Sequence, residues 1–154
     1  TAYDAYIVHF PVPAFFDYAD TKDAMWRERS VQATLRAQRK VDVALFGIGA
    51  FGGAIPSHVY SGGYFDAAAQ RTLREQGVVG DICTILLRED GSWKDLEMNR
   101  RASGPTPTEL THIPRRLCVA SGVHRAAVLR AALRTGAITD LVLDEQLGRA
   151  LIEK

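Results

Sequence analysis

An excess of charge of either sign is absent from this sequence of 154 residues. Lys and Arg number 19 and Asp and Glu number 18, so the formal net charge at pH 7 is only +1. A protein that wraps nucleic acid needs a basic surface to meet the phosphates. The charge balance therefore excludes this segment as the DNA-reading part of a protein.

Cysteine is nearly absent as well. The two cysteines, Cys83 and Cys118, each lie in an apolar run, where a buried free thiol is the usual state. This usage fits a reducing, cytoplasmic compartment. Neither the cysteines nor the four scattered histidines have the spacing of metal ligands, so we expect no metal and no cofactor.

Long apolar runs are also missing. No apolar stretch approaches the length needed to cross a bilayer, and the N-terminus lacks the basic, apolar and small-residue order of a signal peptide, so we expect a soluble protein without a membrane partner.

What the sequence does have is 47% hydrophobic and 24% charged residues. This is the profile of one globular α/β domain with a real core. Because Thr1 opens a strand-like segment, we expect a piece of a longer chain.

The hydrophobic patterning predicts strands and helices in alternation. Asp20 and Asp66 are candidate N-caps, and Asp90-Gly91 predicts a hairpin turn. Gly77 and Gly136 are placed to end helices. The expected strands are 4–10, 41–47, 80–87, 92–99, 115–121 and 138–144, and the expected helices are 21–40, 67–76, 107–113, 123–133 and 145–153.

This order, β-α-β-α-β-β-α-β-α-β-α, predicts the α/β fold class. We expect an open, mostly parallel sheet with helices on both faces and an antiparallel hairpin at one edge. The nearly continuous apolar run 41–47 is typical of a strand covered on both sides. In such folds ligands bind outside the carboxyl ends of the strands.

Two basic residues stand where the helix 123–133 begins. His124 and Arg125 follow the Ser121-Gly122 turn, and a helix N-terminus disfavours basic side chains unless an anion sits between them. Phosphate is the common occupant of such a place. The alternative is an Arg125 side chain solvated on an exposed face.

A Ser121–His124 nucleophile pair is disfavoured, because the glycine two residues before the serine and a third orienting group are both missing.

A glycine-rich stretch follows the strand 41–47. Residues 47–52 match the pattern GxGxxG, but Gly53 and Pro56 keep the chain in a loop where a dinucleotide site needs a helix. Gly47 and Gly49 could let backbone N–H groups approach a small ligand, or they could form a plain turn.

Acidic residues are expected at the same edge of the sheet. Asp81 lies at the mouth of one strand, and Asp144 and Glu145 end the last one, while Arg125 begins a helix beside a third. Carboxylates beside a basic group suit a polyol phosphate. Capping of the helix 145–153 is the alternative role for Asp144 and Glu145.

Six segments follow one another along the chain: "PVPAF", "VDVALFGIGAF", "LREQGVVGDICTILLREDG", "NRR", "VASGVHRAAVLRAAL" and "ITDLVLDEQLGRAL". In this order they resemble the sugar-binding, effector-sensing domain of SorC-type and DeoR-like bacterial transcriptional regulators. The resemblance covers nearly the whole chain and implies a fold related to sugar-phosphate isomerases, glucosamine-phosphate deaminases and CoA transferases.

The resemblance implies a domain that binds a phosphorylated sugar or polyol and controls operator DNA through a helix-turn-helix segment that is absent here. It implies a homodimer or homotetramer. It also implies that residues 1–154 are the C-terminal portion of one effector domain, whose earlier half supplies a phosphate loop with glycine and threonine. With the charge pattern, it predicts seven ligand-binding residues: Gly47, Ile48, Gly49, Asp81, Gly122, His124 and Arg125.

Two positions depart from the family pattern. Arg125 stands where these regulators usually have lysine, and arginine can hold a phosphate but cannot form a Schiff base. Ser121 replaces a common glycine. We therefore expect a sensor with no catalytic residues. The alternatives are a sugar-phosphate isomerase or deaminase with Asp81 as general base, and an oligomerisation domain with a vestigial pocket.

Overall fold

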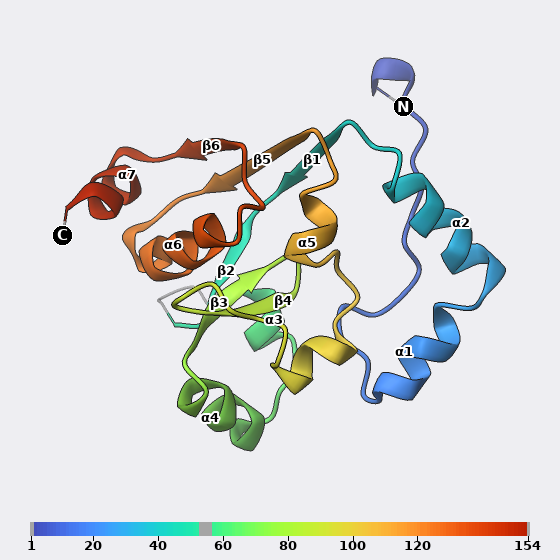
Figure 1. Cartoon of the computed structure of the whole chain (residues 1–154), viewed down its shortest axis with the longest axis horizontal. Coiled ribbons are helices and arrows are strands. Elements are labelled where there is room, and N and C mark those ends of the chain that lie inside the picture. Colours follow the sequence, from blue (N-terminus) through green and yellow to red (C-terminus); the bar gives the residue numbers. More distant parts are fainter. Residues whose placement is uncertain (1, 53–56, 154) are drawn as a thin grey trace.

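A parallel sheet of three strands forms one half of the fold (Figure 1). In the computed structural model, residues 2–52 and 57–153 are described. Strands β1 (Val43–Phe46), β5 (Arg115–Ala120) and β6 (Asp140–Leu143) pair in the order β1-β5-β6. The α/β class and the parallel pairing are confirmed.

An antiparallel sheet of three strands forms the other half. It pairs β2 (Ile48–Ala50), β3 (Val78–Ile82) and β4 (Ile85–Arg88) in the order β2-β3-β4. The expected single strand 80–87 is wrong, because the chain reverses at Cys83 and Thr84, which both have positive φ angles (48° and 72°). Two such residues make the tight turn of a hairpin without any glycine.

Seven α-helices and three 3-10 helices are described beside the two sheets. In the part of the chain that the structure describes, none is long and apolar enough to cross a bilayer. The helices are α1 (Ala19–Met25), α2 (Arg29–Gln38), α3 (His58–Ser61), α4 (Ala67–Glu75), α5 (Pro107–Leu110), α6 (Ala126–Arg134) and α7 (Glu145–Ile152), and the 3-10 helices are η1 (Ala2–Asp4), η2 (Glu97–Arg101) and η3 (Val123–Arg125).

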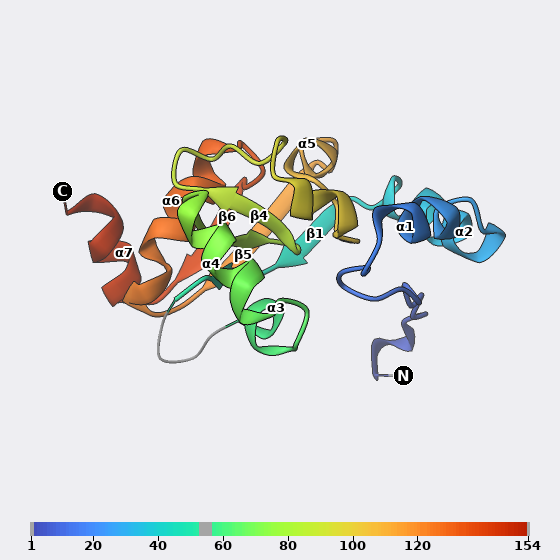
Figure 2. The same cartoon turned by 90° about the horizontal axis from the view of Figure 1, so that it is seen from below.

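Helix α6 joins the two sheets into one core. It connects β5 to β6, as a parallel pair requires, and it packs on β2, β3 and β4. Its apolar side buries Val128, Leu129, Ala131 and Ala132 completely. By contrast, α1 and α2 stand to one side of the sheets (Figure 2).

Several local predictions are confirmed. Asp66 caps α4 by accepting from Ala69 N at 2.7 Å. Gly77 and Gly136 follow helices α4 and α6 with positive φ angles. Thr106 opens α5 with a capping box, although this helix is shorter than expected.

Three predicted elements are wrong. The helix 21–40 is broken into α1 and α2, and Asp20 lies inside the first turn of α1 without capping it. Residues 92–99 form no strand, because the hairpin turn falls at Cys83-Thr84. The segment 4–10 contains no strand either, because none of the described strands pairs with it.

The outer face of the parallel sheet is apolar and exposed. Val43 and Leu45 of β1 are 53% and 69% exposed, and the paired residues Val119 and Val142 of β5 and β6 are 46% and 51% exposed. The register places all four side chains on one face. Within the described chain, the expectation that the strand 41–47 is covered on both sides is therefore wrong.

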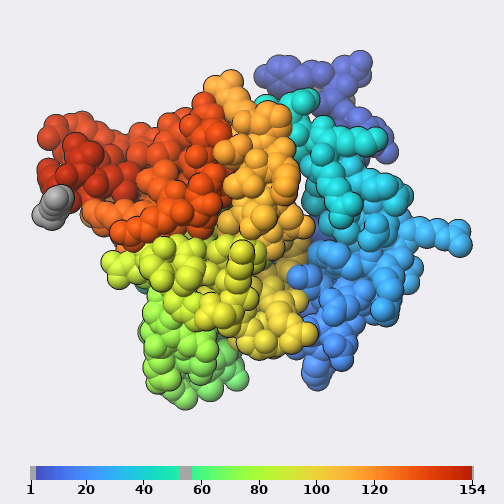
Figure 3. Space-filling model, in the orientation of Figure 1, coloured from blue at the N-terminus to red at the C-terminus, as the bar shows by residue number. Residues whose placement is uncertain are grey.

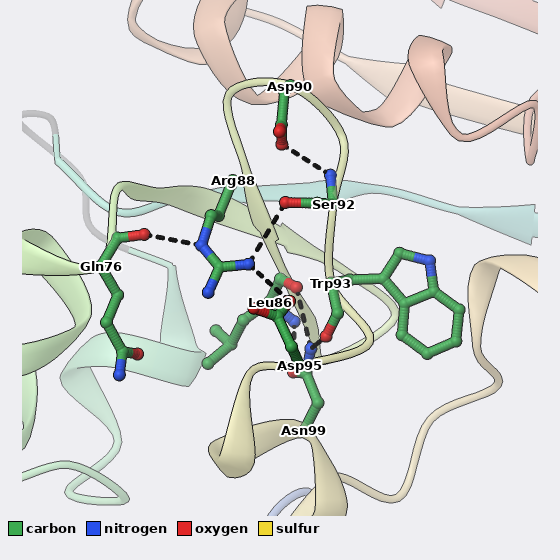
Figure 4. Close-up of polar contacts among 8 residues, drawn as sticks. All are labelled: Gln76, Leu86, Arg88, Asp90, Ser92, Trp93, Asp95 and Asn99. Atoms are coloured by element: carbon green, nitrogen blue, oxygen red, sulfur yellow. Dashed lines mark hydrogen bonds and ion pairs between the residues drawn. The ribbon is translucent and has the colours of Figure 1, made fainter.

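Asn99 closes the free edge of the antiparallel sheet (Figure 4). Its Oδ1 accepts from Leu86 N at 2.8 Å, and its Nδ2 donates to Leu86 O at 3.0 Å and to Trp93 O at 2.8 Å. Leu86 belongs to β4, so the side-chain amide takes the place of a further strand. Beside it, Arg88 donates to Gln76 O and forms an ion pair with Asp95.

We expect Asn99→Ala to lower the free energy of unfolding by roughly 2–4 kcal/mol, because it leaves the buried N–H and C=O of Leu86 without partners. Urea denaturation measures the change. The matched control is Arg100→Ala, which removes only an exposed ion pair with Glu97 and should cost less than about 1 kcal/mol. Equal losses in the two variants would contradict this role for Asn99.

Candidate functional site

The carboxyl ends of the parallel strands meet at one edge of the sheet. Gly47 follows β1, Ser121 and Gly122 follow β5, and Asp144 follows β6. A side chain at Gly47 would lie 3.5 Å from Val119 O, which places the end of β1 directly beside β5. The edge predicted from the sequence is therefore assembled in the fold for these residues, but the expectation that Asp81 lies at it is wrong, because Asp81 belongs to β3 of the antiparallel sheet.

The Ser121–Arg125 turn lies at the centre of this edge. Gly122 has φ 89° and ψ 131°, and the His124 ring lies so close that a Cβ at position 122 would be 2.8 Å from its Cε1. The positive φ favours glycine, whereas the exposed His124 ring could turn away from a Cβ at this position. Arg125 N donates to Gly122 O at 3.0 Å, which starts η3 rather than α6, so Arg125 stands just before α6.

The Arg125 side chain is half-buried and folds back on the turn. Its guanidinium donates to Ser121 O. Among the described residues it makes no ion pair. Since a guanidinium carries five N–H donors, most of them are free for an anion. His124 is exposed next to it.

The expected glycine loop is largely a strand. Ile48 and Gly49 belong to β2 and are buried, whereas Gly47 and Gly52 are exposed on either side of the strand. Part of the expected loop, residues 53–56, falls outside the described residues. The GxGxxG pattern thus runs into an antiparallel strand and not into the helix that a dinucleotide site needs.

Asp81 lies inside the antiparallel sheet, opposite Gly49. Its side chain is only 5% exposed, and Oδ2 accepts from Thr84 N at 3.2 Å. Oδ1 lies against Gly49, where a Cβ would overlap it and would come within 2.6 Å of Ser57 Oγ. Only a glycine at position 49 leaves room for this carboxylate.

Tyr60 is a polar neighbour of Asp81 that reasoning from the sequence did not identify. The Tyr60 hydroxyl and Asp81 Oδ1 are buried, and neither makes a hydrogen bond within the described part of the chain. The ring of Tyr60 packs edge-on against Phe51, with centroids 4.7 Å apart. The sequence around Tyr60 shows only an aromatic residue in a glycine-rich stretch, which is the usual signal of a core residue.

Burial dominates the titration of Asp81. It raises the pKa of this carboxyl to about 7, although the Thr84 N–H and the Tyr60 hydroxyl act in the opposite direction. Burial and the neighbouring Asp81 also raise the pKa of the Tyr60 hydroxyl. Asp81 is therefore poised to exchange a proton near neutral pH.

The seven predicted ligand residues form two groups in the structure. Gly47, Gly122, His124 and Arg125 lie at the carboxyl edge of the parallel sheet, and Ile48, Gly49 and Asp81 lie in the antiparallel sheet. Among the described residues, no hydrogen bond or ion pair joins Asp81 to the turn. Strand β2 links the groups, because it contacts both η3 and β5.

No group of three metal-ligating side chains occurs in the described ranges.

The raised pKa of Asp81 predicts how stability depends on pH. Between about pH 4 and pH 7 the folded protein binds a proton here that the unfolded chain has lost, so the free energy of unfolding falls as pH rises through this range. Asp81→Asn cannot ionise and should lack this fall. Urea denaturation at pH 5 and pH 8 measures both proteins. As the control, the exposed Asp95→Asn should keep the wild-type fall, and an identical fall in Asp81→Asn would refute the assignment.

Curated proteins similar to this chain are bacterial regulators. It is 32% identical over 143 residues to the transcriptional regulator LsrR of Klebsiella pneumoniae, a match that covers 92% of this chain and 44% of that protein. It is 26% identical to the deoxyribonucleoside regulator of Bacillus subtilis, over 94% of this chain and 45% of that protein. The chain spans about half the length of the curated relatives it matches.

Solved structures share the fold. A domain of a possible sugar-binding transcriptional regulator from Arthrobacter aurescens has a TM-score of 0.84 and 43% sequence identity, covering 94% of this chain and 54% of that one. The full-length sorbitol operon regulator SorC from Klebsiella pneumoniae has a TM-score of 0.79 at 21% identity, covering 92% and 45%. The model of the sugar-binding domain family, Sugar-bind, matches residues 1–153. Because this match takes in all but the last residue, the chain belongs to the sugar-binding domain family.

Proposed function

We propose that this chain is the sensing part of a bacterial transcriptional regulator and that it binds a phosphorylated sugar or polyol without turning it over. The family match over residues 1–153 supports sugar binding, and the relatives are regulators. The observation that supports the proposal most directly is the Ser121–Arg125 turn: among the described residues its guanidinium makes no ion pair, and it lies at the carboxyl edge of the sheet, where α/β folds usually bind ligands.

The phosphate would bind at this turn. The Arg125 guanidinium matches phosphate geometry through paired N–H donors, and a hydrogen bond to a charged group is stronger than a neutral one. Gly47 lies on the neighbouring strand end and is exposed, so its backbone can approach the same ligand. His124 is exposed beside Arg125 and offers a further donor.

The sugar hydroxyls would face the second group of residues. Asp81 has an oxygen without a partner in the described chain, and Ile48 and Gly49 line the strand that leads from Gly47 to it. An acceptor of this kind suits a hydroxyl donor. The curated relatives are regulators, which favours sensing over isomerase or deaminase chemistry with Asp81 as general base.

We also propose that residues 1–154 are the C-terminal portion of one effector domain. Among the described residues, β1 is an edge strand of the parallel sheet and pairs only with β5. A groove of about 820 Å³ follows its other side, between β1, α5 and the α1–α2 segment (Figure 3). Its apolar lining includes Trp26, Leu35, Ala44, Leu45, Phe46 and Leu110.

Parallel sheets are normally covered on both faces. An earlier half of the domain, paired with β1 and packed on the bare face, would supply that cover and the rest of the ligand site. The regulator would read operator DNA through a separate helix-turn-helix segment and act in the cytoplasm as a homodimer or homotetramer.

The coding sequence before Thr1 tests this organisation. We expect a continuous reading frame that encodes a helix-turn-helix and a loop with glycine and threonine, because a chain with a net charge of +1 carries no DNA-reading surface and β1 has a free edge. Sequencing that region settles the matter. A start codon immediately before Thr1 would contradict it.

Arg125→Ala tests the phosphate site in the product of the complete reading frame. We expect the wild-type protein to gain thermal stability with at least one of ribose 5-phosphate, glucose 6-phosphate, fructose 6-phosphate and sorbitol 6-phosphate. Arg125→Ala should bind that compound about tenfold more weakly or worse, since a charged hydrogen bond is lost. Calorimetric titration measures the affinity.

The matched control is Arg134→Ala, at the other end of α6, where the arginine also donates to a backbone carbonyl, that of Glu89. It should bind like the wild type. Equal binding by Arg125→Ala would exclude this role for Arg125. Conversion of the compound to a product would show an enzyme, and oligomers that respond to none of the four compounds would indicate a vestigial pocket.

A further inference from the structure

The Asp144 carboxylate bonds to two different elements. Its Oδ1 accepts from Leu147 N at 2.8 Å and so caps α7. Its Oδ2 accepts from Gly122 N at 2.5 Å, across 22 residues of sequence. One side chain therefore holds both the beginning of α7 and the turn after β5.

Capping alone does not require the second bond. Asp66 caps α4 with the same geometry, accepting from the N–H three residues later at 2.7 Å. Its other oxygen makes no hydrogen bond within the described residues. The bond from Gly122 to Asp144 is therefore not needed for capping α7. It instead connects α7 to the turn that carries Arg125.

The backbone of Gly122 has a conformation that few residues adopt, and Asp144 holds it there. Gly122 has φ 89°. Its N–H is the first donor of the turn, and no other described residue accepts from it. The two backbone N–H groups also lower the pKa of Asp144, so this carboxylate stays ionised and able to accept both bonds at neutral pH.

Helix α7 packs on the core through Leu147, Ala150 and Leu151, and it contacts α6 and η3. Arg130 of α6 donates to Ala150 O, while Ile152 at the end of α7 is 81% exposed. A change in the Asp144 cap therefore acts on the first turn of a helix that lies directly against the Gly122–Arg125 turn.

We propose that Asp144 is a positioning residue of the effector site, which holds the Gly122–Arg125 turn in its ligand-binding form and couples the occupancy of that turn to α7. This inference rests on the proposed function. An effector bound at the turn orders it, and through the shared carboxylate it also orders the first turn of α7. By linkage, weakening the Asp144 bonds must weaken effector binding.

The test compares Asp144→Ser with Asp66→Ser in the product of the complete reading frame. Serine remains a good N-cap but is too short to reach Gly122 as well, so both variants keep a helix cap and Asp144→Ser should lose more thermal stability because it also loses the bond from Gly122. Only Asp144→Ser should bind the sugar phosphate about tenfold more weakly, as expected for a lost charged hydrogen bond. Asp144→Asn, which has one acceptor oxygen for two donors, should lie between wild type and Asp144→Ser.

Hydrogen exchange of the backbone amides gives a second measurement. In the wild type, the sugar phosphate should slow exchange at Leu147 severalfold, and in Asp144→Ser it should not. If the wild type binds none of the four sugar phosphates, the proposed function fails. If the wild type binds one of them but Asp144→Ser binds it equally and still shows slowed exchange, the coupling through Asp144 is refuted while the proposed function stands.

Discussion

Parallel pairing of β5 with β1 on one side and β6 on the other is the constraint on which the site depends. Because the three strands run in the same direction, their carboxyl ends must come out at one edge. Gly47, Gly122 and Asp144 then become neighbours although 97 residues separate the first from the last. The hydrogen bond from Gly122 to Asp144 is possible only with this arrangement.

The antiparallel sheet serves a different purpose from the parallel one. Its strand β3 carries Asp81, which is buried beside Tyr60 of α3, and one oxygen atom of each lacks a hydrogen-bond partner in the described chain. A buried carboxyl without full pairing reduces stability. If Asp81 binds a ligand hydroxyl as proposed, stability and binding compete at the same carboxylate, as is common at functional sites.

The exposed face of the parallel sheet explains the least successful part of the sequence interpretation. Residues 4–10 have the pattern of a strand, and residues 41–47 have that of a strand buried on both sides, yet the first pairs with nothing described and the second is half exposed. A hydrophobic pattern of this kind indicates that a segment is buried when the protein is fully assembled. The curated relatives that this chain matches are about twice as long as it is.

The sequence by itself determined the α/β class, the strands β5 and β6, the Asp66 and Asp144 caps and the turn at Gly122, because each depends on residues within one or two turns of the chain. Only the tertiary structure decided the rest. The reversal at Cys83-Thr84 is held by Asp81 and by the bond from Gly104 N to Thr84 Oγ1, and β4 is closed by Asn99. The burial of Asp81 and the second bond of Asp144 likewise depend on residues far away in the sequence, and such contacts leave no local pattern from which they could be predicted.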